Sequence, residues 1–329
     1  MKPVKLGIIG CGLAAQNIHR PALEMLKDKF EIVCVCNHTE QKAKDLARLI
    51  GGAAYCADYR QMLEDKNIEA VDIALPIDLN YQAVKDSLDA GKHVIVEKPL
   101  AANMEQAKQM LSFPDHYKKV MMVAENVRYR PSTTKLKGYI DSGVIGKPYA
   151  LFWDVFHHLT NDNPYMQTQW RLDHKYPGGI LLDGGVHLIA GIRTLVGDIT
   201  ELTSRVKSIN PGIGRMDSLS ILFTTAQGVC GVCNMYNSAI CGVENRLRIL
   251  GDKGTLILAN STIEIQTNEN SSKEQIENDG GIIEEFNDFF SAIRMQTPVS
   301  SSFYQAYKDM EAIVAAVESK DWHLVKTSI

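Results

Sequence analysis

The first 124 residues alternate continuous apolar runs with segments of helical periodicity. The apolar runs predict strands, and they cover residues 4–9, 31–36, 53–56, 71–75, 93–96 and 120–124. The segments of helical period lie between them, at 14–26, 41–50, 59–63, 81–90 and 104–111. Continuously apolar strands separated by helices favour a parallel sheet covered on both faces, and right-handed crossovers make it doubly wound. The pattern therefore predicts an α/β domain over residues 1–124.

After residue 124 the pattern changes to strands with few helices between them. The strand-like segments are 150–156, 202–206, 218–224, 229–235, 246–250 and 255–259, and helical periodicity returns at 185–195, 284–293 and 305–317. Residues 260–279 are rich in Asn, Ser and Glu without an apolar period, which predicts an exposed loop or hairpin tip. Residues 125–329 are therefore predicted to form an α+β domain with a mostly antiparallel sheet and helices on one face.

Length and charge agree with two globular domains. A chain of 329 residues suggests two domains at about 100–200 residues each. With 35 Lys+Arg against 39 Asp+Glu the net charge is −4, which argues against a nucleic-acid or anionic-membrane surface. No apolar run reaches the roughly 20 residues that span a bilayer, and Gly7, Gly10 and Gly12 interrupt the one apolar start that could imitate a signal peptide. We expect a cytoplasmic protein.

The seven cysteines do not form a disulfide framework, because their number is odd and their spacing irregular. Cys230 and Cys233 have CxxC spacing, but in a strand their side chains would face opposite sides. We interpret the cysteines as small buried thiols in a reducing compartment.

A glycine-rich loop follows the first predicted strand and opens the first predicted helix. Gly10 permits a tight turn, Gly12 lets a pyrophosphate approach the backbone, and Ala15 stands in place of a third glycine. The helix N-terminus adds free N–H groups and the positive end of its dipole. This context predicts a dinucleotide site with the loop residues Gly10, Cys11, Gly12, Leu13 and Ala14.

The ribose of that cofactor is expected near the end of the second strand, at Asn37 and His38. A site that prefers NAD usually has a carboxylate there, which repels a 2′-phosphate. Here an amide and an imidazole are followed by Lys42, and none of these groups repels a phosphate. The sequence therefore favours NADP over NAD.

Two further segments carry candidate redox chemistry. Glu97, Lys98 and Pro99 follow a predicted strand, at the carboxyl end where ligands of open α/β sheets gather. Asp183 and His187 are four residues apart, which would place a carboxylate and an imidazole on one helix face. Asp183 could also be a helix cap, and His187 a hydrogen-bonded core histidine. No third residue stands at metal-ligand spacing, so the sequence predicts no metal.

Together these motifs resemble those of the Gfo/Idh/MocA family, which includes glucose–fructose oxidoreductases and inositol dehydrogenases. The resemblance covers nearly the whole chain and rests on the GxGxxA loop with His19 downstream, on Glu97-Lys98-Pro99 and on Asp183-x-Gly185-x-His187. It implies a Rossmann domain, a C-terminal domain whose large open sheet is used for oligomerisation and substrate binding, and NAD(P)-dependent redox chemistry.

The resemblance also implies roles for individual residues. The catalytic roles fall on Lys98, Asp183 and His187. Further cofactor contacts fall on Leu75, Pro76, Asn80, Glu97, Lys98 and Asn126. We expect substrate contacts at Lys98, Arg171, Asp183 and His187. From their place in the chain we add His158 and Tyr236, for which the alternatives are packing or solvent exposure for His158 and a core or interface role for Tyr236. Arg171 could instead clamp a cofactor phosphate or pair with a carboxylate, and only one of His157 and His158 can face the site from a strand.

The sequence thus favours an oxidoreductase that transfers a hydride between nicotinamide and a carbinol or carbonyl carbon of a sugar, cyclitol or nucleotide sugar. From the resemblance we expect a homodimer or homotetramer that pairs through the C-terminal sheet. The alternatives are a reductase of a non-sugar carbonyl, imine or dihydrodiol, and a non-catalytic sensor that binds the cofactor. The presence of Lys98, Asp183 and His187 argues against the sensor, because a pure binder does not need them.

Overall fold

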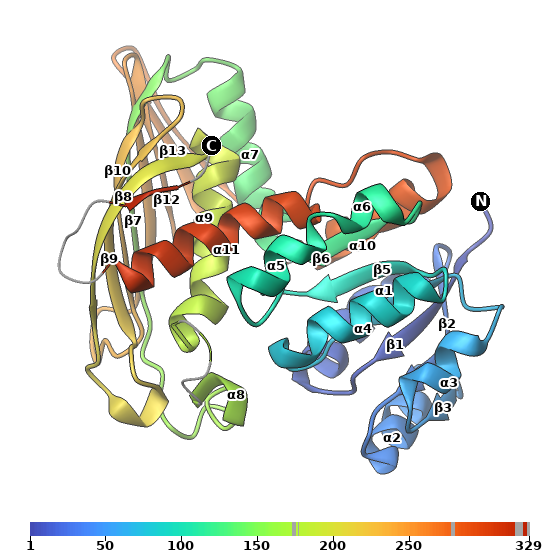
Figure 1. The fold of residues 1–329 in the computed structure, drawn as a ribbon. Coiled ribbons are helices and arrows are strands. Elements are labelled where there is room, and N and C mark those ends of the chain that lie inside the picture. Colours follow the sequence, from blue (N-terminus) through green and yellow to red (C-terminus); the bar gives the residue numbers. More distant parts are fainter. Residues whose placement is uncertain (173–175, 177, 278–279, 320–324, 328–329) are drawn as a thin grey trace. The chain divides into compact units, whose positions relative to one another are not determined.

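The computed structural model describes residues 1–172, 176, 178–277, 280–319 and 325–327. The chain divides into two compact units (Figure 1). The first comprises Met1–Asn126 and Gly281–Tyr307, and the second comprises Val127–Gly280 and Lys308–Ile329. Among the described residues, no helix combines the length and the apolar character that are needed to cross a membrane.

The first unit is built on a parallel sheet of six strands in the order β3-β2-β1-β4-β5-β6. The strands are β1 (Val4–Ile9), β2 (Phe30–Cys36), β3 (Ala54–Cys56), β4 (Ala70–Ile73), β5 (His93–Glu97) and β6 (Met121–Ala124). This order is that of a dinucleotide-binding Rossmann sheet, and it confirms the predicted parallel α/β fold. The residues of β4 and β6 are buried throughout, as continuous apolar patterning requires.

Helices connect these strands close to the predicted positions. They are η1 (Ala15–His19), α1 (Arg20–Met25), α2 (Glu40–Ile50), α3 (Tyr59–Glu64), α4 (Ile77–Asp89), α5 (Met104–Met110) and α6 (Phe113–His116). A further helix of this unit, α10 (Ile282–Met295), comes much later in the chain. Helix α2 ends at Gly51, whose φ of 100° is the left-handed conformation that favours glycine as a C-cap.

Helix α10 belongs to the first unit, although the sequence analysis placed its residues in the second domain. The rings of Phe286, Phe289 and Phe290 lie 5.8, 6.4 and 5.8 Å from the ring of Phe30 in β2. Helical periodicity indicates which residues of α10 are buried, but it carries no information on which sheet buries them. Residues 281–307 therefore belong to the N-terminal unit, although most of the second unit precedes them in the sequence.

The second unit contains a sheet of nine strands in the order β14-β13-β12-β11-β7-β10-β9-β8-β15. They are β7 (Pro148–Phe156), β8 (Ile199–Lys207), β9 (Ser218–Thr225), β10 (Cys230–Tyr236), β11 (Glu244–Gly251), β12 (Gly254–Ala259), β13 (Thr262–Thr267), β14 (Ser271–Gln275) and β15 (Val325–Lys326). β7 and β10 are parallel and the other pairs are antiparallel, which confirms the mostly antiparallel sheet.

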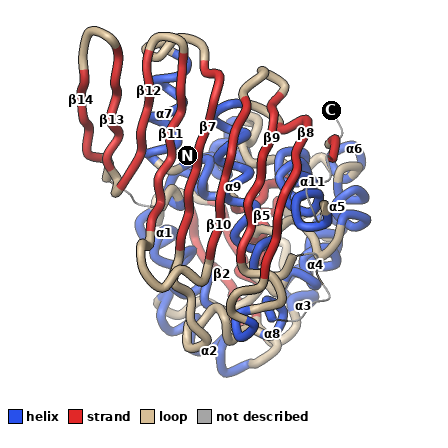
Figure 2. Tube along the Cα trace, turned by 90° about the vertical axis from the view of Figure 1, so that its left-hand side faces the viewer, coloured by secondary structure: helices blue, strands red, loops and turns tan. Residues whose placement is uncertain are grey.

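Helices of this unit lie on one face of its sheet. Figure 2 shows α7 and α9 behind the strands. The remaining helical segments are η2 (Asn126–Tyr129), which begins at the boundary of the units, α7 (Pro131–Asp141), α8 (Gln169–Leu172), α9 (Ile180–Val196), η3 (Pro211–Ile213) and α11 (Phe303–Glu318), whose first residues belong to the first unit.

Two local expectations need correction. Residues 260–279 were expected to form an exposed loop or hairpin tip, but residues 262–275 form the two paired strands of the antiparallel hairpin β13–β14 and the turn between them. The turn that leads into it is Asn260-Ser261, where φ values of 50° and 59° fit a two-residue hairpin turn. The cysteines are not all buried, because Cys230 and Cys241 are exposed.

Candidate active site

The loop after β1 has the geometry of a phosphate-binding turn. Gly10 has a φ of +102°, and a Cβ at this position would lie 2.2 Å from the carbonyl oxygen of Ala74. Only glycine fits there. A Cβ on Gly12, in contrast, would meet no atom of the described residues within 4 Å. Gly10 therefore closes the turn, whereas the backbone of Gly12 is open to a ligand.

Cys11 and Asn37 hold this loop from the inside. Cys11 is fully buried, its Sγ donates to the carbonyl of Cys36 at 3.5 Å, and burial raises the pKa of the thiol to about 12. The Cys11 N–H donates to Oδ1 of Asn37 at 3.2 Å, while Nδ2 of Asn37 donates to the carbonyl of Thr39 at 3.3 Å. The structure thus gives Asn37 a loop-positioning contact, and it leaves His38 exposed before α2.

The accessible part of the loop fits a dinucleotide pyrophosphate. Gly12 is exposed, and Leu13 and Ala14 are partly exposed. Among the described side chains none caps the helix at Ala14, so its first N–H groups face the loop. Backbone N–H groups and the positive end of the helix dipole are the partners that a phosphate needs. These residues could therefore hold the cofactor that the glycine motif predicts.

Other predicted cofactor residues gather at the same edge of the sheet. The strands are parallel, so their carboxyl ends lie together. The residues that end or follow β4, β5 and β6 are Leu75, Pro76, Glu97, Lys98 and Asn126. Leu75 lies beside the glycine loop, since its Cδ2 would be 3.2 Å from a Cβ on Gly10.

Asn80 fixes the backbone around Lys98. This residue of α4 is 1% exposed, and its Nδ2 donates to the carbonyl oxygens of Glu97 at 3.1 Å and Pro99 at 3.0 Å. Those carbonyls stand on either side of Lys98. Asn80, which the sequence analysis expected to touch the cofactor, therefore uses both amide hydrogens to hold the end of β5.

A buried histidine holds the side chain of Glu97. Nδ1 of His19 lies 2.8 Å from Asp72 Oδ2, and Nε2 lies 2.9 Å from Glu97 Oε1. His19 and Asp72 are 1% and 0% exposed. Burial alone would lower the pKa of His19, but the charges and hydrogen bonds of Asp72 and Glu97 outweigh it, and the pKa lies well above 6.5. His19 is therefore an imidazolium between two carboxylates.

The surroundings of this imidazolium come from η1, β4, β5 and α10. From α10, Phe286 packs its ring edge-on at 5.5 Å, and the neighbouring Glu285 is fully buried. Burial raises the pKa of Glu285 well above 4.5, against the opposing charge of His19. This direction of the pKa shift favours the neutral form of Glu285 beside the His19 cluster.

In the second unit, Asp183 and His187 lie one turn apart on α9. Most of this helix is buried, but both residues are partly exposed. Gly185 stands between them because a Cβ there would lie 2.4 Å from Cδ1 of Ile313, so the helix can pack closely against α11. The structure therefore confirms that Asp183 and His187 share one accessible helix face.

Arg171 pairs with Asp183, one of the alternatives that the sequence left open. Its Nε donates to Asp183 Oδ2 at 2.7 Å, and its Nη1 donates to Oγ1 of Thr168 at 2.8 Å. The guanidinium also lies over the ring of Tyr165, 5.2 Å from its centroid. The Asp183 carboxylate is thus held in place next to His187.

Tyr236 is not on the helix side of the sheet. Met235 faces α9, where its Sδ would lie 3.5 Å from a Cβ on Gly184, and alternation along β10 turns Tyr236 to the opposite face. There its hydroxyl lies 2.9 Å from Oγ of Ser220. Tyr236 and Asp183 were both expected to contact the substrate, but the structure does not bring these two side chains together.

The two adjacent histidines follow β7 and are both exposed. Nδ1 of His157 lies 3.4 Å from Oδ1 of Asn237, and His158 forms an isolated antiparallel bridge with Ser238. Alternation from the buried Val155 gives His157 the helix-side position and His158 the opposite one. A substrate contact was expected at His158. This placement favours His157 for such a contact instead.

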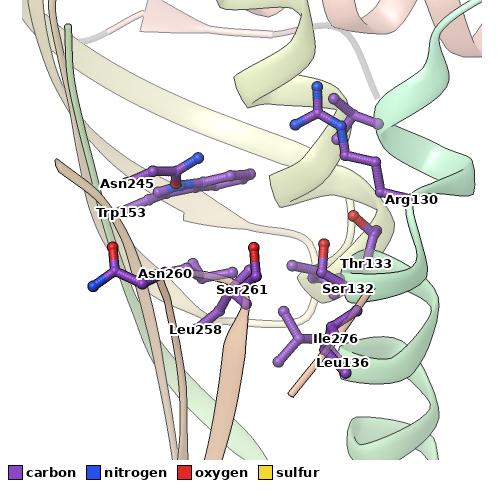
Figure 3. Close-up of a pocket in the computed structure, with 13 residues that line it drawn as sticks. Arg130, Ser132, Thr133, Leu136, Trp153, Asn245, Leu258, Asn260, Ser261 and Ile276 are labelled. Atoms are coloured by element: carbon purple, nitrogen blue, oxygen red, sulfur yellow. The ribbon is translucent and has the colours of Figure 1, made fainter. Parts of the chain in front are cut away.

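A cavity of about 190 Å³ lies inside the second unit, between α7 and the sheet (Figure 3). Arg130, Ser132 and Thr133 line it from the helix side, and Trp153 and Asn245 from the sheet. Nε1 of Trp153 donates to Oδ1 of Asn245 at 2.9 Å. The cavity is smaller than usual ligand pockets, and neither Asp183 nor His187 lines it. It is thus separate from the predicted redox site.

Two family models match the chain. Residues 4–125 match the model described as the oxidoreductase family with a NAD-binding Rossmann fold, and residues 133–257 match the GFO/IDH/MocA C-terminal domain. The protein YMR315W of Saccharomyces cerevisiae is 31% identical over 264 residues, which cover 78% of this chain and 74% of that protein. The chain belongs to the Gfo/Idh/MocA oxidoreductase family.

Further relatives agree with this assignment. Myo-inositol 2-dehydrogenase of Thermotoga maritima is 25% identical over 78% of this chain and 75% of its own. The crystal structure of an oxidoreductase from the same species has a TM-score of 0.93 at 33% identity, with 98% of each chain covered. Levoglucosan dehydrogenase in complex with NADH and levoglucosan has a TM-score of 0.88 at 24% identity, with 99% of each chain covered, and shows likeness of fold.

Proposed function

We propose that the chain is an NAD(P)-dependent dehydrogenase or reductase that acts on the CH–OH group, or the corresponding carbonyl, of a sugar, cyclitol or nucleotide sugar. The observation that carries the proposal is the pairing of an open glycine loop with a lysine at the same sheet edge. The family assignment adds redox chemistry, and the Asp183–His187 face adds groups for proton transfer. Relatives that act on myo-inositol and levoglucosan support a polyhydroxylated substrate.

Each residue has a distinct task in this reaction. When bound, the nicotinamide accepts or donates the hydride. Lys98 stabilises the negative charge that develops on the substrate oxygen, because an ammonium group is the matching cation. His187 takes the hydroxyl proton during oxidation and returns it during reduction, since an imidazole is suited to proton transfer near neutral pH. Asp183, held by Arg171, orients the substrate or the His187 ring.

The roles of Lys98 and His187 can each be tested by substitution. Lys98→Met and His187→Ala should each lower kcat by at least about 100-fold, the usual scale for acid–base groups. The assay follows absorbance at 340 nm with a panel of polyols, ketoses and nucleotide sugars. Near-normal turnover in both variants would remove these roles.

Matched controls exist on exposed helices of the first unit. Lys108 on α5 and His116 on α6 are both exposed. Lys108→Met and His116→Ala should leave kcat unchanged within about twofold, since surface substitutions rarely alter the fold. A wild-type protein that binds nucleotide in a thermal-shift assay, but turns over no member of the panel, would favour the sensor alternative.

We infer a preference for NADP from the charge at the ribose end. Asn37 places an amide there, and the exposed His38 and Lys42 add an imidazole and a lysine side chain. A carboxylate that would repel the 2′-phosphate is not among these residues. KM should therefore be lower for NADPH than for NADH, and a strong NADH preference would contradict the inference.

We also propose that the chain pairs through the open face of its large sheet. Phe152, Val232 and Leu222 form a row across β7, β10 and β9, and Phe152 and Leu222 are 40% and 49% exposed. An apolar row on a sheet face suits a self-complementary interface. Sedimentation should show a homodimer or homotetramer that Leu222→Glu weakens, whereas a monomeric wild type would contradict the proposal.

A further inference from the structure

We propose that the cavity between α7 and the large sheet binds a small organic monocarboxylate, at a site separate from the proposed redox site. This α7 cavity is bordered by Ser132 and Thr133 on the helix and by Trp153, Asn245 and Leu258 on the sheet (Figure 3). All of these residues belong to the second unit. The inference therefore does not depend on the proposed dehydrogenase activity.

A buried hydroxyl group faces the α7 cavity. Thr133 is 5% exposed and lines the cavity, and its hydroxyl has no hydrogen-bond partner among the described residues. In Figure 3 the Thr133 oxygen points away from α7, toward the sheet. Buried polar groups in folded proteins are almost always hydrogen-bonded. The partner of this hydroxyl must therefore enter the cavity, as water or as a ligand.

The first turn of α7 adds further donors beside this hydroxyl. The N–H groups of Ser132 and Thr133 precede the intrahelical hydrogen bonds, and they have no acceptor among the described residues. Pro131, at the first position, has no N–H, and no side chain caps the helix at Arg130. These groups lie at the positive end of the helix dipole, so they favour a negatively charged partner.

The described walls of the α7 cavity supply donors and a cation but no carboxylate. Oδ1 of Asn245 accepts from Nε1 of Trp153 at 2.9 Å, which leaves the amide nitrogen of Asn245 for a ligand. Arg130 also lines the cavity, and no Asp or Glu is among the described lining residues. With one cation in the lining, a carboxylate fits better than the higher charge of a phosphate.

The remaining walls are apolar and limit the size of the ligand. Leu136, Leu258 and Ile276 contribute to them. The volume is about 190 Å³, and an apolar cavity of about 150 Å³ is large enough for a benzene ring. The α7 cavity therefore accommodates a ring or a branched alkyl group together with one carboxylate. Asn245 and Asn260, which also line it, are exposed and give a ligand access from solvent.

Isothermal titration calorimetry of the full chain with benzoate tests the proposal. Benzoate should bind with one-to-one stoichiometry and a dissociation constant of about 1 mM or lower, as suits so small a ligand. Benzyl alcohol has a similar shape but no charge, and it should bind at least about tenfold more weakly, because charge-assisted hydrogen bonds are the stronger ones. Equal binding of the two probes, or no binding of benzoate up to about 20 mM, would overturn the proposal.

The substitution Asn245→Asp separates the charge of the site from its shape. Aspartate still accepts the hydrogen bond of Trp153, but it places a carboxylate beside that of the ligand. Benzoate should bind at least about tenfold more weakly, whereas the affinity for benzyl alcohol should change by less than about twofold. The matched control is Asn268→Asp, at an exposed position outside the lining, which should leave both affinities within about twofold. An unchanged affinity for benzoate in Asn245→Asp would contradict the assignment.

Variants of Thr133 test the buried hydroxyl. Thr133→Val keeps the shape of the side chain and should weaken benzoate at least about threefold, while Thr133→Ser keeps the hydroxyl and should stay within about twofold of wild type. Thr134→Val, at the exposed neighbouring position, is the control for the loss of a hydroxyl on this helix. Equal affinity in Thr133→Val and wild type would overturn the assignment. If Thr133→Val does not fold, the result for Asn245→Asp decides.

A last comparison locates the bound probe. His187 does not line the α7 cavity, so His187→Ala should bind benzoate as tightly as wild type. Saturating NADPH should also leave benzoate bound, because the glycine loop belongs to the other unit. Loss of binding in His187→Ala, or displacement of benzoate by the nucleotide, would place the probe in the proposed redox site and overturn the proposal.

Discussion

Each unit of the molecule buries a charged cluster, and the two clusters have opposite designs. In the first unit the cation His19 lies between the carboxylates of Asp72 and Glu97. In the second unit the carboxylate of Asp309 lies between two guanidinium groups, with Arg128 and Arg193 each 2.5 Å away. Both centres are almost completely buried, so neither is a weak surface ion pair.

The difference lies in whether the central charge can be lost. Arginine keeps its charge at any accessible pH, so the Asp309 cluster has one state, and it links α11 to η2 and α9 as a permanent tie. A histidine can release its proton, so the His19 cluster has two states. Only the cluster that can change state ends at the sheet edge that carries Lys98.

The largest expected effect comes from breaking the permanent cluster. Asp309→Asn keeps the shape of the side chain but removes the carboxylate that Arg128 and Arg193 share, while Arg193 keeps its pair at 2.7 Å with Asp198, whose side chain is 45% exposed. The free energy of unfolding should fall by about 3–5 kcal/mol, as for other buried ion pairs that lose one partner. Urea denaturation measures this fall, and a loss below about 1 kcal/mol would show that the cluster is not a structural tie.

The same helix offers a control for that prediction. Glu318 lies at the end of α11, and its side chain is exposed. Glu318→Gln should cost under about 1 kcal/mol, because an exposed charge contributes little to stability. Comparable losses for both variants would mean that the helix responds to any charge removal.

A smaller effect is expected from the corresponding change in the first unit. Asp72→Asn also removes a buried carboxylate, but His19 keeps Glu97 as its second carboxylate partner at 2.9 Å, so its charge is still compensated. The free energy of unfolding at pH 7 should fall by about 2 kcal/mol, the scale of one hydrogen bond to a charged group. A loss as large as that of Asp309→Asn would contradict the idea that Glu97 compensates the remaining charge.

Much of the first unit could be predicted because its pattern is local. Continuous apolar runs fix β1, β4 and β6, and a left-handed glycine ends α2 at Gly51. The hairpin β13–β14 could not be predicted in this way, since its last strand, Ser271–Gln275, is polar and almost fully exposed. Helix α7 was also missed, although Pro131 at its first position is a typical start signal.

The parts of the candidate site that lie in short sequence motifs could be predicted, whereas the parts that depend on tertiary contacts could not. The glycine loop and the Asp183–His187 spacing are visible in the sequence, and the structure places both as expected. The His19 cluster joins residues 19, 72 and 97, which lie in η1, β4 and β5, and no spacing rule links them. One signal could have pointed to it: Asp72 interrupts an apolar strand, and a buried carboxylate needs a partner.

The pH dependence of stability separates the two charged clusters. In the first unit the pKa of His19 is raised, whereas the pKa of His93 is lowered. The raised pKa of His19 means that its contribution to stability is complete below about pH 6.5 and is lost as the pH rises through the folded-state pKa. Burial lowers the pKa of His93 to about 4, helped by the charge of Lys119. The unfolded chain therefore binds the extra proton at His93, and that contribution is lost as the pH falls from about 6.5 towards 4.

The directions of these pKa shifts predict opposite pH dependences of the unfolding free energy for the His19 and His93 comparisons, and no pH dependence for the Asp309 comparison. The unfolding free energy of wild type minus that of His19→Gln should decrease from pH 6.5 to 9, by at most about 1.4 kcal/mol per pH unit for one proton. The difference from His93→Gln should decrease more weakly from pH 6.5 to 4.5, since this ring is only partly buried. The difference from Asp309→Asn should stay constant from pH 6.5 to 9, because arginine does not titrate there. A flat His19 line beside a flat Asp309 line would make the two clusters equivalent, and the imidazolium would then be as permanent as a guanidinium.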